Sequence, residues 1–303
     1  AVFNIYADSA CEQLLKTVEC VDGSAVVYVS DMFSETWTYL TDLDGDGNLN
    51  TVTVYVREAS NDGKHILDES VRSVVIEASD MRGDIGGTQE TFVNATRTLT
   101  VSKLDATGGV EVKGATLKLY SATKEGVITS DFYESWVSGS DGVDSEGKLL
   151  PHVVYGISEG YYVLQESDVP NGYLGASDIL FYVSDAATQS VTMEDERPYG
   201  YVNIQKNDPD GAKIEGVRFL ISRRDTGDSF EIETMEDGSA VSPHLPINEL
   251  VDGRITPIIY DIEEIYVPAG YVLDDAKHEV VFEYAGSSEN LIRYDLNVVN
   301  EFQ

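Results

Sequence analysis

A glutamate occupies an inward position in an apolar strand pattern. Residues 161–173 read YYVLQESDVPNGY, and every second residue gives Tyr162, Leu164 and Glu166. In a β-strand these three side chains share one face. Burying a lone carboxylate is unfavourable, so Glu166 at this position predicts either a partner for the acid or a reaction that uses it.

An internal repeat supplies the partners. LTVSKLDATGGVEVKGATLKLYS from Leu99 corresponds to VNIQKNDPDGAKIEGVRFLISRR from Val202, YVLQESDVPNGY corresponds to YDIEEIYVPAGY, and VTMEDER corresponds to NVVNEF. Each copy has a lysine in its first strand, a glutamate in its middle segment and an Asp or Asn in its last strand. All six fall at the alternating strand positions that are otherwise apolar, so they are predicted to point into the core. They are Lys103, Glu166 and Asp195 in the first copy, and Lys206, Glu264 and Asn300 in the second.

These residue types can form an amide bond. A side chain at a strand end can reach water, but six residues in register make that explanation weak, and a buried ion cluster is a poor source of stability. Burial favours the neutral amine and the neutral acid, and a neutral amine is a nucleophile. Attack on the side-chain carbonyl carbon of Asp195 or Asn300, with the glutamate moving protons, would release water or ammonia and leave a crosslink.

The lysine strand, the KGATLKLY step, the YVLQESDVPNGY segment and the closing EDE or VNEF resemble the Cna B-type repeats of Gram-positive collagen adhesins and sortase-assembled pilins. In that family the acid segment is called the E-box. The resemblance implies prealbumin-like, Ig-like β-sandwiches with self-formed isopeptide bonds. Carried over by position, it implies a Lys103–Asp195 bond with Glu166 catalytic, and a Lys206–Asn300 bond with Glu264 catalytic.

The elements that position these residues are short strands. Segments rich in Val, Ile, Tyr and Thr alternate with Gly, Asp and Asn clusters, which predicts an all-β fold of antiparallel sandwiches. The repeat places two tandem domains at 99–198 and 199–303. Residues 1–98 lack its landmarks, so we expect a distinct, mostly β N-terminal domain that binds a ligand or joins subunits. Only residues 9–19, SACEQLLKTVE, suggest a helix.

Composition excludes some partners. Asp and Glu total 54 and Lys and Arg total 20, a formal charge of −34, which disfavours nucleic acid and anionic membrane surfaces. No apolar run reaches the roughly 20 residues of a membrane span, and we expect an exported protein in its mature form.

Two weaker patterns lie in residues 1–98. Cys11 and Cys20 are close in sequence, which predicts a short disulfide in an oxidising compartment; two buried free thiols are the alternative. DLDGDGNLN imitates the first half of a calcium loop, although position twelve is Thr53 instead of Glu, and a solvated Asp/Gly turn is the alternative. The candidate calcium ligands are Asp42, Asp44, Asp46 and Asn48.

The leading hypothesis is a structural surface protein of a Gram-positive bacterium, a pilin or an adhesin stalk, with other surface subunits and sortase as partners. The alternative is a ligand-binding module, directed at carbohydrate or matrix protein, on two spacer domains. An enzyme acting on an external substrate has little support, and no cofactor is required. VTVYVRE resembles the pilin motif for subunit joining, but Val56 and Arg57 replace its Pro and Lys. No Leu-Pro-x-Thr-Gly anchor occurs in this sequence, so wall anchoring would rest on residues outside it.

Overall fold

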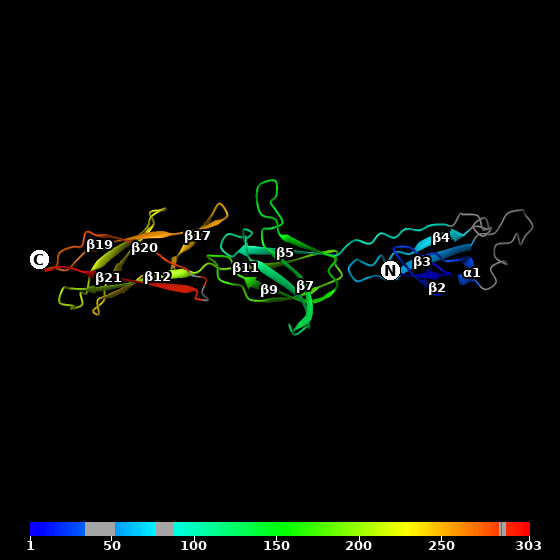
Figure 1. Cartoon of the computed structure of the whole chain (residues 1–303), viewed down its shortest axis with the longest axis horizontal. Coiled ribbons are helices and arrows are strands. Elements are labelled where there is room, and N and C mark those ends of the chain that lie inside the picture. Colours follow the sequence, from blue (N-terminus) through cyan, green and yellow to red (C-terminus); the bar gives the residue numbers. More distant parts are fainter. Residues whose placement is uncertain (34–51, 77–87, 285, 287–288) are drawn as a thin grey trace, which may run out of the picture. The chain divides into compact units, whose positions relative to one another are not determined.

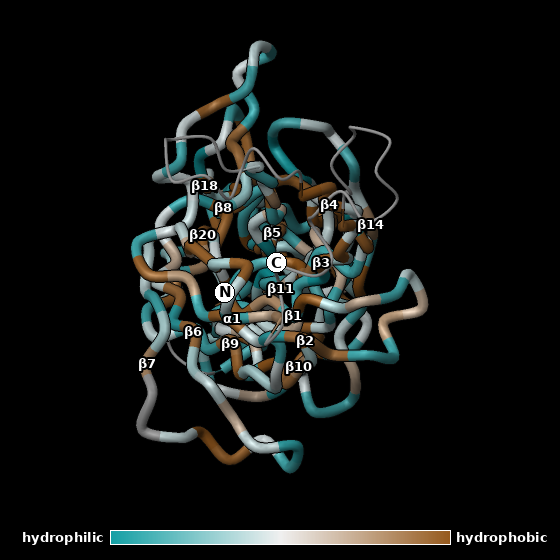
Figure 2. The backbone as a smooth tube through the Cα atoms, turned by 90° about the vertical axis from the view of Figure 1, so that its right-hand side faces the viewer, coloured by the Kyte–Doolittle hydropathy of each residue, from teal (hydrophilic) through white to brown (hydrophobic). Residues whose placement is uncertain are grey.

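β-strands are the main regular structure of the described residues. The structure, a computed structural model, describes residues 1–33, 52–76, 88–284, 286 and 289–303. A single short helix, α1 (Val29–Met32), occurs in this part of the chain. Hydrophobic and hydrophilic residues alternate at short intervals along the backbone (Figure 2), as expected for strands with one buried face.

Two compact units divide the chain. The first comprises residues 1–100, 153–161 and 182–190, and the second comprises residues 101–152, 162–181 and 191–303. The division passes through the middle domain expected from the sequence. Both groups of residues predicted to form crosslinks fall wholly within the second unit, so the geometry of each can be described inside one body.

The N-terminal domain (residues 1–98) contains one four-stranded sheet (Figure 1). Its order is β2-β1-β3-β4, with antiparallel pairing throughout. The strands are β1 (Val2–Tyr6), β2 (Leu14–Glu19), β3 (Val52–Ser60) and β4 (Arg72–Ile76). The helix suggested for residues 9–19 is therefore wrong, because Leu14–Glu19 pairs with β1 as a strand.

The middle domain (residues 99–198) has two sheets. Their orders are β10-β9-β6-β7 and β11-β5-β8. The strands are β5 (Thr98–Asp105), β6 (Thr116–Ala122), β7 (Ile128–Val137), β8 (His152–Tyr155), β9 (Gly160–Asp168), β10 (Ile179–Val183) and β11 (Thr188–Asp195). The first and last strands of the domain, β5 and β11, are neighbours.

The C-terminal domain (residues 199–303) repeats this plan. One sheet has the order β14-β13-β19-β20; in a second, β12 pairs with β15, β16 and, in parallel, with β21. A two-stranded sheet, β17-β18, completes the domain. The bounds are β12 (Tyr199–Asn207), β13 (Arg218–Arg223), β14 (Ser229–Glu233), β15 (Ser239–Val241), β16 (Leu245–Pro246), β17 (Asn248–Val251), β18 (Arg254–Pro257), β19 (Ile259–Tyr266), β20 (Lys277–Val281) and β21 (Leu291–Val299).

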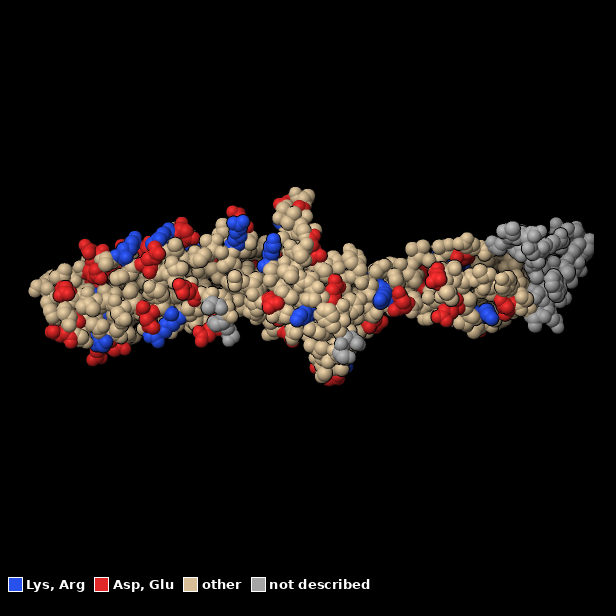
Figure 3. Space-filling model, in the orientation of Figure 1, with Lys and Arg blue, Asp and Glu red and all other residues tan. Residues whose placement is uncertain are grey.

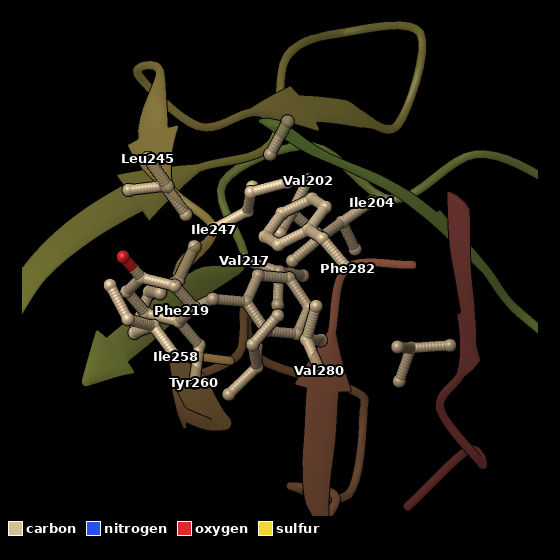
Figure 4. Close-up of a cluster of buried hydrophobic side chains, with 14 of the residues drawn as sticks. Val202, Ile204, Val217, Phe219, Leu245, Ile247, Ile258, Tyr260, Val280 and Phe282 are labelled. Atoms are coloured by element: carbon tan, nitrogen blue, oxygen red, sulfur yellow. The ribbon is translucent and has the colours of Figure 1, made fainter. Parts of the chain in front are cut away.

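An apolar core fills the space between the sheets of the C-terminal domain. Val202 and Ile204 of β12 and Phe219 of β13 are fully buried, and Tyr260 of β19 is 3% exposed. Their side chains point toward one another in Figure 4. Burial of apolar surface stabilises this packing by roughly 25 cal/mol per Å², and it fixes the faces of the strands that carry the polar site residues.

Charged side chains are spread over the surface. The face shown in Figure 3 carries both acidic and basic groups. Several of them form exposed ion pairs across β19 and its neighbours, such as Lys277 with Glu263 at 2.7 Å, which contribute little to stability individually. No helix in the described ranges is long and apolar enough to cross a membrane.

Close packing around β12 gives a test of this core. A Cβ added to Gly200 would lie 2.4 Å from Cδ1 and Cε1 of Phe282, a ring that is 5% exposed. We expect Gly200→Ala to destabilise the C-terminal domain by about 1–3 kcal/mol through overpacking, seen as a lower Tm in calorimetry. Met235→Ala, at an exposed position, is the control and should leave Tm nearly unchanged. An unchanged Tm in Gly200→Ala would contradict the packing described.

Candidate functional site

Two lysines lie in apolar cores because of strand alternation. Residues of β5 alternate between half-buried and buried, and Lys103 falls on the buried side after Leu99 and Val101. Lys206 follows Val202 and Ile204 in the same way in β12. The two lysine residues are 1% and 0% exposed. Apolar neighbours on the same strand face thus hold each amine away from water.

In the middle domain the lysine meets two carboxyl groups. Lys103 Nζ lies 3.2 Å from Glu166 Oε1 and donates a hydrogen bond to Asp195 Oδ1. The three side chains are no more than 1% exposed. Strands β5, β9 and β11 each supply one member. We call Lys103, Glu166 and Asp195 the middle cluster.

The C-terminal domain has the matching arrangement with an amide. Lys206 Nζ lies 2.8 Å from Glu264 Oε2 and donates to Asn300 Oδ1. Asn300 Nδ2 in turn donates to Glu264 Oε1 at 2.8 Å. Neighbouring Glu263 has a side chain that is 46% exposed, so strand parity selects Glu264. We call Lys206, Glu264 and Asn300 the C-terminal cluster.

A backbone group orients each glutamate. The N–H of Ala176 donates to Glu166 Oε2 at 2.9 Å, and the N–H of Asp274 donates to Glu264 Oε1 at 3.0 Å. Both donors lie ten residues after the glutamate, in the segment that leads to the next strand. The acid is therefore held by the local fold as well as by the lysine.

Burial changes the protonation of the reacting groups. Desolvation raises the pKa of Asp195 to about 6, against the opposing effect of nearby Lys103. Desolvation also lowers the pKa of Lys206, partly offset by Glu264. Both shifts favour the uncharged forms, which are the forms that amide formation requires.

The arrangement suits attack by the amine. Each Nζ contacts the side-chain oxygen of the Asp or Asn, which places it beside the carbonyl carbon of that group. The glutamate contacts the amine in both clusters, and in the C-terminal cluster it also contacts the leaving amide nitrogen. A single carboxyl group could therefore take a proton from the amine and return one to the leaving group. The roles of these six residues remain predictions.

A buried carboxylate near the middle cluster was missed from the sequence. Asp105 is 1% exposed, accepts a hydrogen bond from the Tyr173 hydroxyl at 2.9 Å and lies 3.1 Å from Arg197 Nε. The strand parity that identified Lys103 also places Asp105 on the inner face. These contacts tie the Gly-Tyr end of the acid segment to β5.

The predicted disulfide is corrected by the structure. Cys11 and Cys20 are both free. Cys11 lies in the turn before β2 and Cys20 follows the end of that strand, so the six residues of β2 separate them by roughly 20 Å at about 3.3 Å per residue. A disulfide needs Cα atoms within about 7 Å. An extended strand, which the sequence analysis did not assign there, keeps the two thiols apart.

The proposed calcium ligands, Asp42, Asp44, Asp46 and Asn48, lie outside the described residues. Calcium binding therefore stays a prediction.

The fold places the chain in the class of tandem β-sandwich proteins, and a comparison with protein families agrees. A family model described as SpaA, prealbumin-like fold domain, matches residues 97–197 and 200–293. This is more than half of the chain, so the chain belongs to that family. The predicted resemblance to pilin-type B domains and the all-β fold class are confirmed.

Several solved structures are similar to this chain, one of them with a TM-score above 0.5. The Bacillus anthracis TIE protein matches at 19% identity and TM-score 0.55 over 99% of this chain and 47% of that one; this chain thus spans about half its length. A streptococcal ancillary pilin matches at 16% identity and TM-score 0.31, covering 84% and 76% of the two chains. A C-terminal fragment of the pilus adhesin SpaC from Lactobacillus rhamnosus GG matches at 14% and 0.37, covering 68% and 98%. No curated protein matches.

The separation of the two thiols can be tested directly. Cys11 and Cys20 are both partly exposed, so we expect two thiols per chain to react with a maleimide under native, non-reducing conditions, counted by intact mass. Cys11→Ser and Cys20→Ser should each remove one adduct. A protein that takes up no maleimide until it is reduced would contradict the free thiols.

Proposed function

We propose that this protein is a structural subunit of the Gram-positive cell surface, a pilin or an adhesin stalk, stiffened by two self-formed amide bonds. One bond joins Lys103 to Asp195 with release of water, and the other joins Lys206 to Asn300 with release of ammonia. Glu166 and Glu264 act as the proton-transfer groups.

The observation that carries this proposal is the paired burial of the two lysines. A lysine and its acidic partners lose several kcal/mol of solvation when buried, which makes such clusters a poor means of stabilisation alone. Two of them occur with the same strand positions in successive domains. Conversion to an amide removes the buried charges, so a reaction explains why both domains retain the arrangement.

The position of each bond suits a load-bearing role. The linked residues are 92 positions apart in the middle domain and 94 in the C-terminal domain, and each bond ties the first strand of its domain to the last. Force applied along the chain would then load a covalent bond in place of the hydrogen bonds between the two strands. In the chain-entropy model a crosslink closing a loop of this length also stabilises the domain by roughly 4–5 kcal/mol.

The remaining features follow from this role. The reaction is a single turnover within the protein and needs no cofactor, because the amine, the acid and the carbonyl all belong to the chain. We infer that the subunit works outside the cell, on the surface or the cell wall, joined to other surface subunits by a sortase. Membership of the SpaA family supports this placement.

Intact mass provides the test. We expect the purified protein to weigh one water plus one ammonia less than its sequence. Glu166→Gln should restore the water alone and Glu264→Gln the ammonia alone, because a neutral amide cannot relay the protons. Glu263→Gln is the matched control: it changes the neighbouring, exposed carboxylate and should keep both losses. The full sequence mass in the unaltered protein would refute the crosslinks.

The pH dependence of bond formation follows from the Asp195 carboxyl, whose pKa is raised to about 6. The reactive state, a neutral amine beside a protonated acid, holds the same number of protons as the ion pair. Below about pH 6 the site takes up one more proton, which gives a charged amine beside a neutral acid. We therefore expect water loss in the middle cluster to slow by up to about tenfold per pH unit below pH 6.

This dependence can be measured by refolding the denatured, uncrosslinked protein at a series of pH values and following the mass over time. Chemical synthesis of the chain by ligation of peptide segments in denaturant supplies starting material that has never folded and therefore carries no crosslink. Circular dichroism at each pH verifies that the sheets have formed. A rate of water loss that rises steadily from pH 6 to pH 4 would contradict the mechanism.

A further inference from the structure

The N-terminal sheet has the strand order of the sheets that carry the two glutamates. Its order is β2-β1-β3-β4; the corresponding orders are β7-β6-β9-β10 in the middle domain and β14-β13-β19-β20 in the C-terminal domain. The third strand of each sheet in this order contains a buried glutamate side chain: Glu58 in β3, Glu166 in β9 and Glu264 in β19. Glu58 thus occupies the strand that supplies the acid in both clusters.

A backbone contact to Glu58 has the same sequence offset as in the clusters. The N–H of Asp68, ten residues after Glu58, donates to its Oε2 at 2.9 Å. Ala176 and Asp274 do the same for the other two glutamates, also ten residues on. The segment after β3 therefore orients its acid as the segments after β9 and β19 do.

A second backbone contact identifies the residue equivalent to Asp195 and Asn300. In both clusters, the residue eight positions after the glutamate donates a hydrogen bond from its backbone N–H. The acceptor is the carbonyl of the residue that follows the Asp or Asn. These hydrogen bonds are Leu174 to Glu196 at 2.8 Å and Val272 to Glu301 at 2.9 Å. In the N-terminal domain Ile66, eight residues after Glu58, donates to Ala95 at 2.8 Å. The residue before Ala95 is Asn94.

The contact between Asn94 and Glu58 matches this assignment. Asn94 Nδ2 donates to Oε1 and Oε2 of Glu58 at 2.7 and 2.9 Å, as Asn300 Nδ2 donates to Glu264 at 2.8 Å. Glu58 is 2% exposed. Asn94 Oδ1 is buried and accepts no hydrogen bond from any described residue, whereas Asn300 Oδ1 accepts one from Lys206.

The strand that pairs with Glu58 also matches the strand that pairs with Glu264 in the C-terminal domain. Phe3 of β1 pairs with Glu58 immediately after a register shift, and Phe219 of β13 pairs with Glu264 immediately after the same kind of shift. Lys206 Nζ lies 5.9 Å from the centre of the Phe219 ring. Phe3 therefore occupies the position that borders the amine in the C-terminal cluster.

A lysine strand is the part that the described N-terminal domain lacks. None of its strands corresponds to β5 or β12. Its two lysines, Lys16 in the outer strand β2 and Lys64 in an exposed turn, have no described hydrogen bond or ion pair with Glu58 or Asn94. The described N-terminal domain thus has the Glu58 carboxyl group and the Asn94 amide, whose Oδ1 accepts no hydrogen bond, but it lacks the amine.

We propose that Glu58 and Asn94 form a third amide-forming site, which takes a lysine amine presented on an extended strand that the described N-terminal domain does not itself supply. The inference rests on the reaction proposed for the middle and C-terminal clusters. The neutral lysine Nζ attacks Asn94 Cγ, a new C–N bond forms, and the bond from Cγ to Nδ2 breaks. Glu58 carries the proton from the amine to the departing Nδ2, so ammonia leaves and no oxidant or reductant is needed.

A fusion supplies the missing strand in the same polypeptide. Aligning Phe3 with Phe219 also aligns Ala1 with residue 217, because each lies two positions before its phenylalanine. Residues 199–216 therefore correspond to a segment that would directly precede Ala1. A copy of residues 199–216 placed directly before Ala1 of the full chain should therefore bring its lysine to Asn94. We expect the fusion to lose one ammonia more than the unfused chain does, with a crosslinked peptide joining the added lysine to Asn94.

Matched variants assign that loss to this site. Changing the added copy of Lys206 to arginine, Asn94→Ala or Glu58→Gln should each abolish the additional loss of ammonia and leave the losses from the other two clusters intact. Circular dichroism shows whether each variant keeps its sheet content. Glu69→Gln, at an exposed position in the same domain, should retain the additional loss.

A second arm supplies the strand from a separate molecule. The unfused protein is incubated with a synthetic peptide of residues 199–211, and an adduct of peptide mass minus one ammonia at Asn94 would show that another chain can provide the lysine. A folded fusion without the additional loss, together with no peptide adduct, would overturn the third site. If the losses from Lys103 and Lys206 persist in that protein, the proposed function stands; if they are absent too, both fail.

Discussion

Burial of the lysine amine is the constraint on which the rest of the site depends. Taking an ammonium group out of water costs several kcal/mol even when it is paired, yet Lys103 and Lys206 sit at core positions of β5 and β12. The apolar residues on the same strand faces hold them there. Each cluster can relieve that desolvation by removing the charge, and amide formation does so permanently. The strand order then matters because it decides which acid and which carbonyl meet the amine.

In the proposed reactions, the two clusters would reach the same kind of product from different charge states. With all groups ionised, the middle cluster would hold one positive and two negative charges, and burial, with a smaller contribution from nearby Glu166, raises the pKa of Asp195. The C-terminal cluster has a neutral Asn300, so Lys206 and Glu264 balance each other. The proposed reaction in the middle cluster would release water, and the one in the C-terminal cluster would release ammonia. The shared backbone contact holds the glutamate in the same way in both clusters.

Strand parity and the repeat were enough to predict the all-β fold and to select six residues that the structure brings together in two clusters. The same reasoning failed where it relied on nearness in sequence: Cys11 and Cys20 are close along the chain, but the extended β2 separates them. It also overlooked Glu58 and Asn94. The described N-terminal domain has no lysine strand, which removes one landmark of the repeat. The spacing from the glutamate to the next glycine also differs, with five positions from Glu58 to Gly63 and six from Glu166 to Gly172. The repeat is therefore not visible in the sequence, although the hydrogen bonds eight and ten residues after the glutamate are the same.

The N-terminal domain also bears on the order of events. Glu58 and Asn94 hold the same contact as Glu264 and Asn300 although no lysine of the described residues contacts them. The backbone contacts made eight and ten residues after the glutamate can therefore align the acid with the amide before an amine is present. If alignment precedes the amine, arrival of the lysine strand completes the site, and crosslinking is coupled to the pairing of the first strand with the last. A domain would then form its bond only after its sheet has closed, which protects the buried amine from reacting in a misfolded register.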